Sequence, residues 1–145
     1  MAPIQRESFI AKQPNISKLF LKVSFDFDDL ARTWVVKEEA NKPHPQKVLI
    51  KDSKPGDGNI PFFEVGRTLD YKNKNYIVIG TYLDLQQIAN PDQFMKDLVI
   101  DYHLVEDDDI PGNFFESMVY HPRSSEMIFS NNNKAVYITK IIEIS

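Results

Sequence analysis

The chain has 145 residues, of which 42% are hydrophobic and 26% are charged, and it contains no cysteine. This length and balance are typical of one folded domain and argue against a disordered chain. The absence of cysteine excludes disulfides, thiolate zinc sites and cysteine nucleophiles. The N-terminal residues are polar, and no apolar run approaches the roughly 18–20 residues of a membrane span, so we expect a soluble, cytoplasmic protein without a signal peptide.

Charge is distributed unevenly along the chain. Residues 1–85 carry 13 Lys and Arg against 11 Asp and Glu, residues 86–145 carry 4 against 10, and the net charge is −4. An acidic half repels a phosphate backbone, because nonspecific nucleic-acid affinity comes from cations that neutralise phosphates. We therefore do not expect nucleic acid as the partner. The acidity either suits a basic protein partner or keeps the domain soluble.

We divide the chain into a polar N-terminal lead-in, residues 1–15, and a single globular domain, residues 16–145. The clearest element of the domain is a strand over residues 19–27. Apolar residues occupy every odd position from Leu19 to Phe27, and this period of two predicts a strand with one face in the core.

The next segment admits two predictions. Asp28 can cap a helix, Leu30, Trp34 and Val35 then fall on one helical face, and residues 37–40 are good helix formers. The alternative is a strand over residues 33–37, because Thr-Trp-Val-Val also favours strands. The helix is the preferred prediction.

The middle of the chain predicts three strands, over residues 47–51, 62–70 and 75–83, with a loop at 52–59 that is rich in turn formers. The second and third strands are expected to join across residues 71–74, with Asn73 at a position that needs left-handed backbone angles. The third strand places Ile77, Ile79, Thr81 and Leu83 on one side and Tyr76, Val78 and Tyr82 on the other, and because both sides are apolar we expect it to lie centrally, between two layers. Residues 65–80 resemble the hairpin of many small SH3-like barrels, a common motif that does not identify a family.

The C-terminal part begins with a helix-start signature, Asn90-Pro91-Asp92-Gln93, which predicts a short helix through Asp97. A strand over 100–104 and a closing hairpin of 126–130 with 135–144 follow. The expected fold is therefore α+β and β-dominated, with a mostly antiparallel sheet or a small SH3-like, barrel-type core of six to seven strands and about two short helices.

No pattern in the sequence indicates a catalytic residue, a cofactor or a strong metal site. The three histidines, His44, His103 and His121, are not spaced as zinc ligands, and the chain has no nucleophile elbow or phosphate-binding glycine loop. Asp26, Asp28 and Asp29 are weak metal candidates, because a cation needs several converging oxygens. Capping of a helix by Asp28 is the simpler interpretation.

Two further groups of residues are candidates for binding. Lysines and an arginine surround a strand pair that bears three tyrosines, as in proteins that hold single-stranded nucleic acid, although residues 37–74 contain eight cations against six anions. The candidates of this group are Lys51, Lys54, Arg67, Lys72, Lys74 and Tyr76. The second group consists of the adjacent ring pairs Phe62–Phe63 and Phe114–Phe115. Neighbouring strand residues point to opposite faces, so one ring of each pair is available for a protein interface unless both are buried.

The preferred hypothesis is a non-enzymatic protein–protein interaction module. It would be a structural or assembly subunit of a larger complex, or a small acidic adaptor or inhibitor, and its partner would be another protein or a second copy of the chain. The alternatives are a small barrel that binds a ligand or single-stranded nucleic acid, and an enzyme whose site forms only in three dimensions. A flat surface displaying Phe62 or Phe114 favours the first hypothesis, whereas a deep polar pocket with His103, Asp101 or Asp26–Asp29 favours the others.

Overall fold

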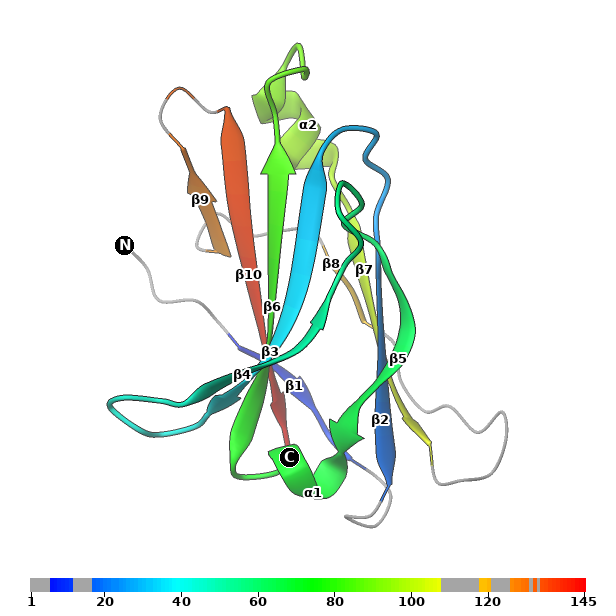
Figure 1. Ribbon diagram of the computed structural model, residues 1–145, viewed down its shortest axis with the longest axis vertical. Coiled ribbons are helices and arrows are strands. Elements are labelled where there is room, and N and C mark those ends of the chain that lie inside the picture. Colours follow the sequence, from blue (N-terminus) through cyan, green and yellow to red (C-terminus); the bar gives the residue numbers. More distant parts are fainter. Residues whose placement is uncertain (1–5, 12–16, 108–117, 121–125, 131, 133) are drawn as a thin grey trace.

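Two β-sheets packed face to face make up most of the computed structural model, which describes residues 6–11, 17–107, 118–120, 126–130, 132 and 134–145 (Figure 1). Within these residues there are ten strands and two short helices. All strand pairs but one are antiparallel, and the described strands do not close into a barrel. The predicted β-dominated α+β fold is confirmed, in the form of antiparallel sheets.

Sheet A is the larger of the two. Its order is β1 (Arg6–Phe9), β10 (Ala135–Ile144), β6 (Asn75–Asp84), β3 (Ala31–Glu39) and β4 (Lys47–Asp52), and β9 (Met127–Phe129) also pairs with β10. Only β1 runs parallel to its neighbour. Because β6 occupies one edge of β10, β9 and β1 share the other edge, where they pair with residues 136–138 and 141–144.

Sheet B has the order β5 (Ile60–Arg67), β2 (Lys18–Ser24), β7 (Ile100–Asp107) and β8 (Met118–Tyr120). The two helices, α1 (Thr68–Tyr71) and α2 (Pro91–Asp97), lie at opposite ends of the sandwich (Figure 1). Because they sit at the ends, they leave the outer faces of both sheets without a helical cover.

The core lies between the sheets and follows the period-two patterns of the sequence. In β6 the alternate residues Ile77, Ile79, Thr81 and Leu83 are fully buried, as predicted for one side of this strand. In β2 the buried residues are Leu19, Leu21 and Val23. The predicted strand at this place is confirmed, but it ends at Ser24, so Phe25 and Phe27 pack against the core from the following segment.

The predicted helix between Asp28 and Ala40 is wrong, because this segment forms β3. Ala31, Thr33 and Val35 are buried on its inner face, which gives the alternation of a strand. β3 pairs along its whole length with β6 and on its other edge with β4. These nonlocal hydrogen bonds and the β-branched and aromatic residues of the segment outweigh the helix propensity of its last four residues.

The predicted hairpin across residues 71–74 is also wrong. β5 belongs to sheet B and β6 to sheet A, so the two strands do not pair, and α1 carries the chain from one sheet to the other. The turn itself was predicted correctly, since Asn73 has a φ of 60°. The short helix after Asn90 and the hairpin of β9 with β10 are confirmed, and the Asn90 side chain accepts a hydrogen bond from the Gln93 N–H.

Candidate interaction face

Four side chains form one row across the outer face of sheet A. Ile128 of β9 lies opposite Tyr137 of β10, Tyr137 lies opposite Tyr82 of β6, and Tyr82 lies opposite Arg32 of β3. The two tyrosine rings are 5.1 Å apart between centroids and tilted by 53°, an arrangement that stabilises aromatic pairs. Ile128 and Tyr137 are 53% and 45% exposed. The row therefore displays large apolar side chains on the outer face of the sheet.

Trp34 extends this row toward the middle of the face. It lies directly opposite Gly80 of β6, and its indole ring occupies the space above this glycine. The guanidinium of Arg32 lies 5.8 Å from the centroid of the Trp34 ring. The absence of a side chain on Gly80 lets the ring lie flat on the sheet and contact its neighbours.

A second row, which is aliphatic, follows beyond Trp34. The register brings together one residue each from β10, β6, β3 and β4 on the outer face, which are Ile141, Val78, Val36 and Leu49. Leu49 is 58% exposed, and the other three are half-buried. We call the two rows and Trp34 together the aromatic face.

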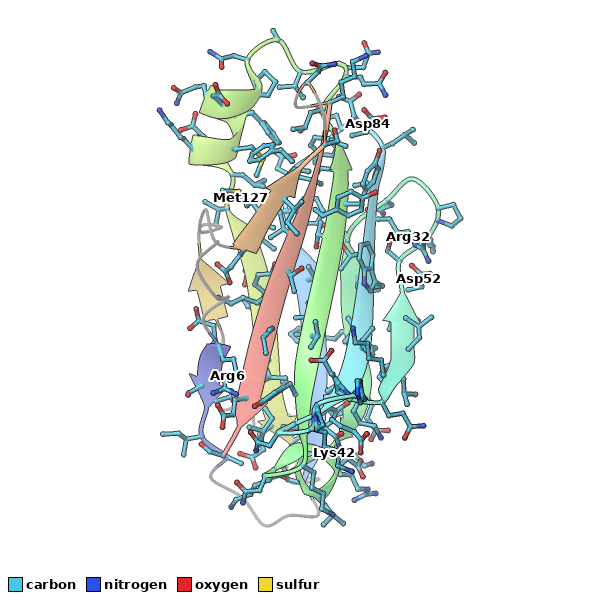
Figure 2. All side chains as sticks on the ribbon, turned by 90° about the vertical axis from the view of Figure 1, so that its left-hand side faces the viewer. Arg6, Arg32, Lys42, Asp52, Asp84 and Met127 are labelled. Atoms are coloured by element: carbon cyan, nitrogen blue, oxygen red, sulfur yellow. The ribbon has the colours of Figure 1, made fainter. Side chains whose placement is uncertain are left out.

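Ion pairs border the aromatic face on two sides. Arg32 donates to both carboxylate oxygens of Asp52 on β4, with an Nε–Oδ1 distance of 3.0 Å. At the lower end Arg6 lies 3.5 Å from Glu143 and contacts Tyr76, and Lys47 lies 3.4 Å from a Glu38 oxygen. Figure 2 shows Arg32 and Asp52 side by side at one edge and Arg6 at the other. An apolar centre with a polar rim is the usual anatomy of a protein interface.

The ionisation of this rim follows from its contacts. The hydrogen bonds and the positive charge of Arg32 lower the pKa of Asp52, and the carboxylate in turn raises the pKa of Arg32. Burial raises the pKa of Tyr82, with smaller contributions from Asp84 and Tyr137. Near neutral pH the Arg32–Asp52 pair is therefore charged, and Tyr82 beside it is neutral.

The predicted interface residues Phe62 and Phe63 lie on sheet B. Phe62 is 49% exposed and Phe63 packs against the core, so adjacent rings do point to different sides. Phe62 stacks on His103 with 6.0 Å between ring centroids, and His103 Nε2 lies 2.9 Å from Asp101 Oδ1. Lys22 Nζ lies 5.7 Å from the Phe62 centroid. Phe114 and Phe115 lie outside the described residues.

The structure separates the cations of the predicted nucleic-acid site. Lys51 and Lys54 line a cavity beside β4, whereas Arg67 ends β5 and Lys72 and Lys74 follow α1. Tyr76 is on β6 and interacts with Arg6. The weak metal candidates Asp26, Asp28 and Asp29 lie between β2 and β3, and within the described parts of the chain no three His, Cys, Asp or Glu side chains are grouped to hold a metal ion.

Sequence reasoning missed the aromatic face because its members are far apart in the chain. The strand pattern of residues 75–83 did place Tyr76, Val78 and Tyr82 together on the second side of a central strand. This apolar second side was the signal that could have revealed the face, but we interpreted it as a side of the strand that a second layer of the protein covers. Among the described elements no such layer covers the second side (Figure 2).

Comparisons with protein-family models, curated proteins and solved structures gave no match. Among the described helices none is long and apolar enough to cross a membrane. The function must therefore be argued from the two sheet faces and the cavity beside β4.

Proposed function

We propose that the protein is an interaction module that binds a protein partner through the aromatic face of sheet A, as an assembly subunit or an adaptor. The observation that carries this proposal is the grouping of Tyr137, Tyr82, Arg32 and Trp34 on the outer face of sheet A. Trp, Tyr and Arg are the residue types that contribute most to binding energy in protein interfaces. Flat sheet faces with large exposed apolar side chains commonly mark such contacts.

The charges on the face favour a protein over a nucleic acid as the partner. Arg32, Arg6 and Lys47 each form an ion pair with a carboxylate of the same sheet. A phosphate backbone would have to displace these carboxylates before any cation could neutralise it, which removes most of the driving force for binding. An apolar protein surface needs no such displacement.

The net charge favours a different chain over a second copy. Each molecule carries −4, so two copies repel at long range, whereas a partner with a basic rim is attracted. We therefore expect a partner with an apolar contact surface and basic residues around it.

Site-specific photo-crosslinking tests this proposal. A photoreactive phenylalanine analogue replaces Tyr137 on the aromatic face or, as the matched control, Phe62 on sheet B, since the two rings have similar exposures of 45% and 49%. In lysate from the source cells, we expect a discrete heavier adduct from position 137 that an excess of unlabelled protein suppresses, and none from position 62.

Three other results would contradict the proposal. An adduct of twice the 16.8 kDa chain mass from position 137 would identify a second copy as the occupant. An adduct from position 62 alone would move the interface to sheet B, and no discrete adduct at either position would leave the module without a partner. A second variant, Ile128→Lys, adds charge to an exposed position and should abolish the adduct at 137 while the fold is retained.

A further inference from the structure

A cavity of about 390 Å³ lies where the chain crosses from sheet A to sheet B, between the end of β4 and the start of β5. This volume is within the range of roughly 300–1,000 Å³ that small-molecule sites occupy. Part of its wall is apolar, formed by Val23 and Ile60, which belong to the core, and by Pro61. The polar part includes three lysines, Lys22, Lys51 and Lys54, which come from both sheets and from the connecting loop.

The wall of the cavity is held by hydrogen bonds at both of its ends. Ser53 bonds to the backbone of Thr33 twice, at 2.8 and 3.0 Å, and the Asn59 side chain accepts a hydrogen bond of 2.9 Å from the Phe25 N–H. Between them, Asp57 N–H donates to the Lys54 carbonyl across a turn in which Gly56 has a φ of 81°. The loop is thus fixed to β3 and to the segment after β2, so the cavity is formed before any ligand arrives.

The cations and anions around the cavity are paired unequally. Asp52 is bound by Arg32, and Asp57 accepts hydrogen bonds of 2.9 and 3.0 Å from the Asn59 backbone and side chain. These contacts lower the pKa of each aspartate and keep both charged. In the described structure Lys22, Lys51 and Lys54 form no ion pair.

The balance of charge identifies the class of ligand. The lining holds three lysines and two aspartates, and one of these aspartates, Asp52, is neutralised by Arg32 from outside the cavity, which leaves a net charge of +2. A phosphomonoester carries about −1.5 to −2 at neutral pH and matches this excess, whereas a carboxylate supplies only half of it. Ser24 also lines the cavity, and its hydroxyl has no hydrogen-bond partner among the described residues, so it can donate to an anion.

We propose that this cavity binds a small organic phosphomonoester, with its phosphate held by Lys22, Lys51 and Lys54 and its apolar part against Val23 and Ile60. The site goes beyond the proposed function and does not depend on it, because the Arg32–Asp52 pair is the one part that the charge of the cavity and the rim of the aromatic face share.

The test is a titration of the full chain with phenyl phosphate, in which NMR spectra record the amide chemical shifts. We expect saturable shifts confined to the amides of residues 22–25 and 51–60, and binding about tenfold tighter than that of benzoate, which has the same ring and a single charge. Shifts that map elsewhere, or equal affinities for phenyl phosphate and benzoate, would overturn the proposal.

Two double variants test whether the lysines of the cavity, and not lysines elsewhere on the surface, bind the phosphate. Lys51 and Lys54 are both exposed, so Lys51→Gln/Lys54→Gln should keep the fold and weaken phenyl phosphate binding by about tenfold or more. The matched control, Lys72→Gln/Lys134→Gln, removes the same charge from exposed lysines that do not line the cavity and should change the affinity less than about twofold. Equal losses in the two double variants would show that only overall charge matters, and would overturn the site.

Discussion

Gly80 of β6 lies directly opposite Trp34 of β3, and the indole ring fills the space that a side chain on Gly80 would need. A Cβ atom built on Gly80 would lie 2.3 Å from Cε2 of Trp34, which no real structure tolerates. We therefore expect Gly80→Ala to displace the ring and to lower the free energy of unfolding by about 1–3 kcal/mol. Trp34 is the only tryptophan in the chain, so its fluorescence emission reports the displacement directly.

The control for this substitution is Thr139→Ala, on the strand that pairs with the other edge of β6. Thr139 lies opposite Gly80, and its replacement removes atoms without adding any. We expect its effect on stability to stay within about 0.5 kcal/mol and the emission maximum to remain unchanged. If Gly80→Ala behaves in the same way, the close packing of Trp34 on Gly80 is wrong.

The fold could be predicted from the sequence where local signals decide the structure. Asn90-Pro91 begins a helix because its cap and proline act within one turn, and Asn73 adopts positive φ because its own side chain tolerates it. Residues 31–39 fit both a helix and a strand locally, and their partners on β6 are 36 to 52 residues away. Nothing within the segment could show that these partners exist.

The candidate sites were hidden for the same reason. Tyr82, Tyr137 and Arg32 become neighbours only through the register of β3, β6 and β10. The sequence of a single strand does not determine which strands it pairs with or in which register. Lys51 and Lys54 were both among the six candidates for a nucleic-acid site, but Lys22, which shares their cavity, comes from the other sheet and was not. Phe62 was predicted because its neighbour Phe63 makes the alternation visible within two residues.

Lys140 lies on the inner face of β10, where the pattern of the strand calls for an apolar residue. Its side chain is fully buried, its Nζ is 3.4 Å from Oε2 of the equally buried Glu126, and it also contacts Glu7. Lys140→Met keeps most of the volume but removes the charge, and we expect it to lower the free energy of unfolding by roughly 3–5 kcal/mol. Urea unfolding measures this change.

A double-mutant cycle separates charge from packing at this position. If the loss arises from the charge of Glu126 without Lys140 beside it, Lys140→Met/Glu126→Gln should be more stable than Lys140→Met alone, with a coupling energy of roughly 0.5–3 kcal/mol. Additive effects of the two substitutions would contradict a direct interaction between Lys140 and Glu126.

Tyr71 makes the stability sensitive to alkaline pH. Its hydroxyl donates a hydrogen bond of 2.5 Å to the Val65 carbonyl, and burial, with a smaller contribution from Asp70, raises its pKa above the ordinary value of 10. The folded protein therefore favours the neutral phenol, so its contribution is complete below pH 10 and is lost as the pH rises further. Tyr71→Phe should lose about 1 kcal/mol at neutral pH and decline less steeply above about pH 10. Parallel curves for the two proteins in urea unfolding across this range would contradict the assignment.

The Arg32–Asp52 pair should stabilise the fold only while Asp52 is ionised. Arg32 lowers the pKa of this carboxylate below its ordinary value of 3.8, so the contribution is present above pH 3.8 and is lost as the pH falls through the lower, folded value. The pair is largely exposed, which keeps its contribution small. We expect Arg32→Gln to be slightly less stable than the wild type at neutral pH in urea unfolding, and the difference to shrink as the pH falls below 3.8 and to be lost once Asp52 is protonated in the folded protein. Because Arg32 also lies over the Trp34 ring, a difference that persists in acid, or in the Asp52→Asn background, would assign its effect to the aromatic ring in place of the carboxylate.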